Sequence, residues 1–126
     1  MFKTKEQNYN KGKLGENLAL DYLTKKGYRL IERNFTTEIG EIDLIMAHKK
    51  ILRFIEVKLK VGDKFGTPEE MISHTKLAQI KRVAQAGLII NPGWKIEFEM
   101  MQIEAVCIVV DEDNKVSRLT HYDNIY

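Results

Sequence analysis

The chain is poor in the residues that cross-link or interrupt a fold. Its 126 residues include one cysteine, Cys107, and two prolines. A single cysteine excludes a disulfide framework, and we expect a buried thiol in a reducing compartment. Neither an internal repeat nor a linker rich in Pro, Gly or Ser divides the sequence, so we predict one domain.

Long apolar runs and an excess of one charge are also missing. No stretch approaches the roughly 20 apolar residues that span a bilayer. The segment Met1–Glu6 is charged and lacks the apolar core of a signal peptide, so we expect a cytoplasmic protein with no membrane partner. The 20 basic and 18 acidic residues give a net charge of +2, which does not by itself indicate nucleic-acid binding. Any phosphate-binding surface must therefore come from local clusters of cations.

What the sequence does contain is the periodicity of an α/β domain. Residues 1–10 are predicted to form a flexible N-terminal tail, and residues 11–126 the domain. Seven segments have the apolar spacing of a helix or a strand: helices over 11–26 and 74–89, and strands over 28–35, 39–47 and 51–59, within 95–110, which is longer than a strand needs, and over 115–121. The order α-β-β-β-α-β-β predicts a mixed central sheet flanked by helices.

Two carboxylates stand on the second and third predicted strands. Asp43 ends the motif GEID of residues 40–43, and Glu56 begins the motif EVK of residues 56–58. If residues 49–50 form a two-residue turn, the strands make an antiparallel hairpin in which Asp43 falls opposite Glu56. A slip of one residue would mix charge into both faces, which burial disfavours. The pattern therefore brings the two acids within cross-strand reach.

Acids on apolar strands need compensation, because opposed like charges destabilise a sheet. A bound Mg²⁺ or Mn²⁺ would supply it, since hard cations prefer oxygen ligands. Lys58, two residues along, could then position or deprotonate a water or stabilise charge on a phosphate. The alternative is a solvated face on which Glu41 and Lys58 form an ion pair worth at most about 1 kcal/mol. The pattern alone leaves both interpretations open.

With these motifs in view, the chain resembles the YraN family of small bacterial proteins, whose members are assigned the PD-(D/E)XK restriction-endonuclease-like fold. The resemblance covers nearly the whole chain. It rests on four motifs: GE-x-x-A-x-x-x-L from Gly15, GEIDLI from Gly40, FIEVK from Phe54, and FG-x-P-x-E from Phe65, which Lys76 follows. It implies a single restriction-endonuclease-like domain.

The same resemblance assigns roles to the residues of the site. It implies that Asp43 and Glu56 are metal ligands with the Val57 carbonyl as a further ligand, and that Lys58 is the catalytic lysine. Glu16 would be the acid of the first helix that completes the metal site. The alternative for Glu16 is an acid of the first helical turn, favoured by the helix dipole.

Three lysines are predicted to contact nucleic acid. Lys60 and Lys64 add positive charge after the third strand, and Lys76 could reach the site from the second helix. Lys60 stands where the family usually has an arginine, so the charge is kept and a bidentate phosphate contact is lost. The segment Gln102–Ala105 replaces the family's Arg-Phe-Asp-Val, which puts any role carried from there in doubt.

Together these features predict a metal-dependent, nuclease-like hydrolase of the endonuclease type. It would cleave phosphodiester bonds in DNA or structured nucleic acid with Mg²⁺ or Mn²⁺, and DNA is expected before RNA. Two alternatives stay open. One is a non-catalytic nucleic-acid-binding or scaffolding module that keeps the nuclease fold. The other is a Holliday-junction-resolvase-like endonuclease that works as a homodimer.

Overall fold

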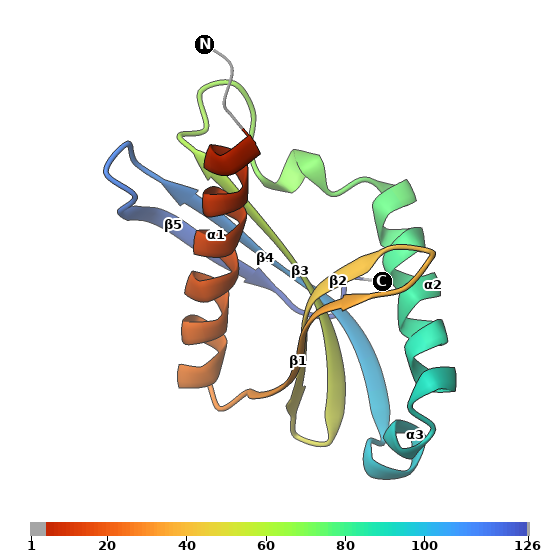
Figure 1. Cartoon of the computed structure of the whole chain (residues 1–126). Helices are drawn as coiled ribbons and strands as arrows, with labels where there is room; N and C mark the ends of the chain where they lie inside the picture. Colours follow the sequence, from red (N-terminus) through yellow and green to blue (C-terminus); the bar gives the residue numbers. More distant parts are fainter. Residues whose placement is uncertain (1–4, 126) are drawn as a thin grey trace.

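The computed structural model describes residues 5–125 of the chain. Within this range, five strands form one sheet in the order β1-β2-β3-β4-β5, with helices packed on both faces (Figure 1). Along the chain the elements are α1 (Lys5–Lys25), β1 (Arg29–Thr36), β2 (Glu41–His48), β3 (Ile51–Val61), the 3₁₀ turn η1 (Glu69–Met71), α2 (His74–Ile90), α3 (Gly93–Glu97), β4 (Met100–Val110) and β5 (Val116–Tyr122).

The sheet is mixed, as predicted. Strands β1, β2 and β3 pair antiparallel, β3 and β4 pair parallel, and β4 and β5 pair antiparallel. The parallel pair requires a crossover, which η1, α2 and α3 provide. The predicted α/β class and the order of the seven main elements are therefore confirmed.

Two boundaries differ from the prediction. Helix α1 begins at Lys5, so residues 5–10 of the predicted tail are helical, and residues 1–4 lie outside the described residues. No Gly or Pro precedes Lys11 to stop the helix. The strand predicted within 95–110 is present, and it starts only at Met100 because Gly93–Glu97 is helical. Apolar and charged residues alternate from Trp94 to Met100 as in a strand, but Trp94 packs against Phe35 while Ile96 is exposed, which a strand would not allow.

Each face of the sheet carries its own apolar core. Helix α1 contributes Ala19 and Leu23 to one cluster, which includes Leu44 and Ile55 of the sheet. Helix α2 contributes Ile80, Val83 and Ala84 to the other, which includes Ile42, Ile45 and Phe54. The apolar face predicted for each helix is therefore the face that packs against the sheet.

The predicted hairpin between β2 and β3 is present, with its predicted register. Lys49 and Lys50 both have positive φ, 54° and 61°, as a two-residue hairpin turn requires. The strands pair from His48–Ile51 to Leu44–Ile55 and no further. Beyond that point β2 stays with β1, β3 stays with β4, and the β1–β2 hairpin turns away toward α2 (Figure 1). A wedge therefore opens between β2 and β3.

Two close contacts set the helices beside this wedge. A Cβ at Gly15 would lie 3.1 Å from Leu59 Cβ, so the glycine lets α1 pack directly on β3. On the other face, the Gln79 side-chain amide donates to the Ile39 carbonyl at 2.8 Å and ties α2 to the β1–β2 turn. The helix α2 starts at the wedge, where the Ser73 hydroxyl caps it by accepting from the Lys76 N–H at 3.1 Å.

Candidate metal centre

Asp43 and Glu56 lie where the wedge opens. One step beyond the last paired residues, the register places them side by side. The Val57 N–H donates to Asp43 Oδ2 at 2.8 Å, which holds this carboxylate against β3. The side chain of Glu56 is only 4% exposed. The hairpin thus brings the two predicted acids together in a largely buried position.

The electrostatics of Asp43 reflect this crowding. Burial, and after it the negative charge of Glu56, raise the pKa of Asp43 to about 7. The Val57 N–H and the Lys58 ammonium act in the opposite direction without cancelling the effect. Ionised carboxylates at this position are therefore disfavoured unless further positive charge arrives.

Glu16 joins the cluster from α1. Burial and the charge of Asp43 raise the pKa of Glu16, and Glu16 Oε1 lies 3.6 Å from Arg33 Nη2. Glu16 lies in the middle of α1, so the alternative that it is a first-turn acid is wrong. Glu41 is also near, because burial and then the charges of Asp43 and Glu16 raise its pKa. Four carboxylates thus act on one another at the wedge.

Two of the predicted cations reach the same place. Lys58 Nζ lies 3.7 Å from Glu56 Oε1, and Lys76 Nζ lies 3.4 Å from Glu56 Oε2. Lys58 therefore pairs with Glu56, not with Glu41 as the alternative interpretation expected. Lys60, near the end of β3, and Lys64, in the loop after it, lie further along: Lys60 Nζ is beside Gly66, and Lys64 Nζ lies over the Phe65 ring.

The donor set fits a hard cation, although it is not a preformed ligand shell. Among residues 5–125, no three His, Cys, Asp or Glu side chains stand as a group that would hold a metal ion. Two buried carboxylate oxygens at the wedge, Glu56 Oε2 and Glu16 Oε1, nevertheless accept no hydrogen bond. Buried oxygens of this kind are normally satisfied, and oxygen is the donor that Mg²⁺ and Mn²⁺ bind.

The raised pKa of Asp43 leads to a stability prediction. The folded protein holds a proton on Asp43 up to about pH 7 and the unfolded chain only to about pH 4, so wild-type stability falls as pH rises between these values. Without added metal, Asp43→Asn should match the wild type near pH 4 and exceed it by as much as about 4 kcal/mol at pH 8. Urea unfolding at both pH values measures this difference. Equal stability at pH 8 would contradict it.

Arg33 is a site residue that the sequence did not reveal. Its guanidinium donates to the Asn17 side chain at 2.8 Å and lies beside Glu16. Arg33 of β1 pairs with Leu44 of β2. The turn over residues 37–40 sets this register, and the sequence pattern did not predict that turn. The only signal was a charge at an alternate position of the first strand.

A second buried polar cluster lies away from the wedge. Arg53 donates to Glu104 Oε2 at 2.8 Å, the Tyr28 hydroxyl donates to Glu104 Oε1 at 3.0 Å, and His121 Nε2 lies 2.8 Å from the same oxygen. Glu104 is fully buried, and Arg53 is nearly so. Both carboxylate oxygens of Glu104 accept hydrogen bonds and, within this cluster, only Arg53 Nε has no partner among the described residues, so we assign the cluster to the stability of the fold.

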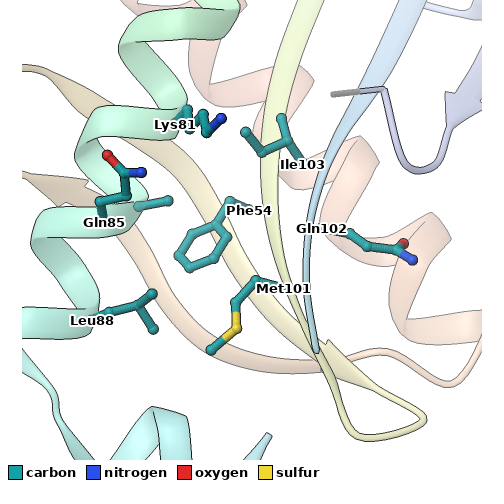
Figure 2. Close-up of a pocket in the computed structure, with 8 residues that line it drawn as sticks. Phe54, Lys81, Gln85, Leu88, Met101, Gln102 and Ile103 are labelled. Carbon is teal, nitrogen blue, oxygen red and sulfur yellow. The ribbon is translucent and has the colours of Figure 1, made fainter. Parts of the chain in front are cut away.

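An apolar hollow on the α2 face is also separate from the carboxylates. Figure 2 shows Phe54, Leu88 and Met101 around it, between α2 and the strands β3 and β4. None of its eight lining residues is acidic: Phe54, Lys81, Ala84, Gln85, Leu88, Met101, Gln102 and Ile103. Its chemistry therefore does not extend that of the wedge.

Fold and site together define a one-sheet α/β protein with a carboxylate cluster and two lysines at the divergence of two strands. Residues 15–108 match the uncharacterised protein family UPF0102. The chain belongs to this family, and the resemblance to the YraN family is thereby confirmed. Separately, no helix within residues 5–125 is long and apolar enough to cross a membrane.

Several relatives align over most of the chain. A UPF0102 protein of Thermodesulfovibrio yellowstonii is 48% identical over 93 residues, which cover 73% of this chain and 83% of the relative. One from Syntrophomonas wolfei is 38% identical over 119 residues, 94% of this chain and 99% of the relative. One from Alkaliphilus oremlandii is 33% identical over 119 residues, 91% and 96% of the two chains.

Proposed function

We propose that the protein is a metal-dependent nuclease of the PD-(D/E)XK class that hydrolyses phosphodiester bonds in nucleic acid. The observation that supports this most is the pair Asp43 and Glu56. Both acids are largely buried at a strand divergence, Glu56 keeps an oxygen without a hydrogen bond, and two lysines lie beside it. A site built for stability alone would avoid such crowding of like charge.

In this proposal Asp43, Glu56 and Glu16 hold a Mg²⁺ or Mn²⁺ ion, with the Val57 carbonyl as a further ligand. Such an ion, when bound, polarises a phosphodiester and lowers the pKa of a bound water. Arg33 keeps the Glu16 carboxylate in place. Binding of a cation would compete with the ammonium of Lys76 for Glu56 Oε2, which frees this lysine for a phosphate oxygen.

Lys58 is proposed as the catalytic lysine. Its side chain is 25% exposed, so the ammonium can approach a substrate while it stays 3.7 Å from Glu56. From there it can stabilise the negative charge that develops on the phosphate, or orient the attacking water. Lys60 at the end of β3 and Lys64 in the loop after it continue the positive charge and would hold the nucleic-acid backbone.

A second candidate function is a nucleic-acid-binding module without catalysis. One observation favours it: Lys58 and Lys76 already neutralise Glu56, so the wedge has counter-charges in the absence of a metal. In that case the lysines would bind phosphate groups, and the carboxylates would only position the lysines. A homodimer that resolves junctions is a further form of the nuclease proposal.

A cleavage assay separates these candidates. The protein is incubated with end-labelled single-stranded DNA, duplex DNA, four-way-junction DNA and RNA, each with Mg²⁺, Mn²⁺ or EDTA. The nuclease proposal predicts products with Mg²⁺ or Mn²⁺ and none with EDTA. Binding in EDTA without products under any condition would support the module. Cleavage of junctions by a species of twice the chain mass would support the dimer.

A further inference from the structure

The loop between β3 and η1 presents an aromatic ring to solvent. Phe65 is 91% exposed, and the ammonium of Lys64 lies 5.7 Å from the centre of its ring. Single exposed apolar side chains are common on protein surfaces, so exposure alone assigns no role. The role that we infer for this ring follows from its position relative to the wedge.

The loop is fixed at both ends. At its start the Gly62 N–H donates to the Val110 carbonyl at 2.9 Å. At its end Glu69 accepts two hydrogen bonds from Arg118, at 2.6 and 2.9 Å, and one from the Tyr122 hydroxyl at 2.8 Å. Arg118 is the main reason that the pKa of Glu69 falls to about 2. The short loop that carries Phe65 is therefore held in place at both ends.

Two adjoining hollows form a groove that runs from Phe65 to Lys58, the lysine beside Glu56. One hollow lies between α1 and the end of β3, and it includes Lys58, which pairs with Glu56. The next hollow includes Phe65, and both are lined by Leu59 and Met71, so the two hollows adjoin.

Among residues 5–125, the side chains that line the two hollows include more cations than acids. Four lysines line the two hollows: Lys11, Lys58, Lys60 and Lys64. Asp111 and Glu112 lie at the far hollow only. A polyanion in the groove is therefore drawn along the lysines.

We propose that Phe65 stacks on an unpaired base of a nucleic acid whose backbone lies in this groove, so that the protein prefers single-stranded or branched substrates to continuous duplex. Aromatic rings on a cationic track are how proteins bind single strands, because every base offers a face for stacking. In a continuous duplex both faces of each base are already stacked, and the ring finds no partner. The inference rests on the nucleic-acid ligand of the proposed function but not on cleavage.

The test is a binding measurement with the full chain in EDTA. Dissociation constants are measured for three labelled DNAs of one length: a single strand, a duplex with one unpaired base, and a continuous duplex. Phe65→Ala should weaken binding to the single strand and to the duplex with one unpaired base by about tenfold, and should leave binding to the continuous duplex unchanged. Phe65→Tyr should bind all three DNAs as the wild type does. The matched control is Ile96→Ala, which removes an apolar side chain that is 90% exposed on α3.

A fluorescent base adds a readout that a structural role would not move. 2-Aminopurine at the unpaired position should be quenched by wild type and by Phe65→Tyr, and not by Phe65→Ala. Unchanged quenching, or an equal loss of affinity for all three DNAs, would overturn the inference. So would a wild type that binds none of them. A protein that shows the stacking signal in EDTA yet never cleaves would keep this inference and refute the nuclease.

Discussion

Replacing Glu56 with Gln is expected to reduce metal-dependent phosphodiester cleavage on the order of 10³-fold. The substitution preserves the volume of a side chain that is 4% exposed and removes the charge that a cation and two lysines would share. Single-turnover rates with Mn²⁺ in excess measure the loss directly. Thermal denaturation of the variant confirms that the effect is chemical and not due to unfolding.

The matched control is Glu38→Gln, the same change at an exposed position in the β1–β2 turn. Its cleavage rate should equal that of the wild type. If Glu56→Gln keeps its rate within about threefold, Glu56 has no part in catalysis. If both variants lose the same activity, the cleavage does not arise at the wedge.

The largest loss of stability is expected from Arg53→Met. This change leaves the carboxylate of Glu104 charged, fully buried and without its cation. Breaking a buried pair in this way costs about 3–5 kcal/mol, a large part of the roughly 5–15 kcal/mol that stabilises a domain. Urea unfolding with a shared m-value gives the free-energy difference.

A surface pair provides the comparison for this prediction. Arg29→Met breaks the ion pair with Glu97, whose partners are 63% and 56% exposed, and should cost less than about 1 kcal/mol. Adding Glu104→Gln to Arg53→Met should recover part of the stability, because the uncompensated charge is removed while acceptors for Tyr28 and His121 stay. A cost for Arg53→Met no greater than that for Arg29→Met would show that the buried pair is unimportant.

The part of the site that the sequence predicted is the part set by local pairing. A two-residue turn at residues 49–50 and the alternation of apolar residues fix the register of one hairpin, which places Asp43 beside Glu56. Lys76 was also expected to reach the site from the second helix, and its ion pair with Glu56 places it there. These inferences need only periods of two and 3.6 residues.

The rest of the site depends on contacts between distant segments. The position of Glu16 follows from the packing of α1 on β3 at Gly15, which the sequence only permits. Arg53 and Glu104 meet because β3 and β4 pair in parallel with α2 and α3 between them, and no local pattern sets that register. Charges on apolar strands were the one available signal.

The extent of β3 explains why two lysines lie away from the acids. The strand runs to Val61, two residues beyond its predicted end, and a strand rises about 3.3 Å per residue. Lys60 and Lys64 therefore lie further along the groove, toward Phe65. The predicted cations are therefore spread along the molecule, with Lys58 beside Glu56 and Lys64 beside Phe65.

The most direct test of the central claim, that the wedge binds a divalent cation, is a thermal shift measured against Mn²⁺ at pH 8 for wild type and Asp43→Asn. At a metal concentration ten times the dissociation constant, the wild-type melting temperature should rise by roughly 5 °C. The Asn variant should start from a higher melting temperature without metal and show no rise. A flat wild-type titration, or an equal rise in both proteins, would contradict the metal centre.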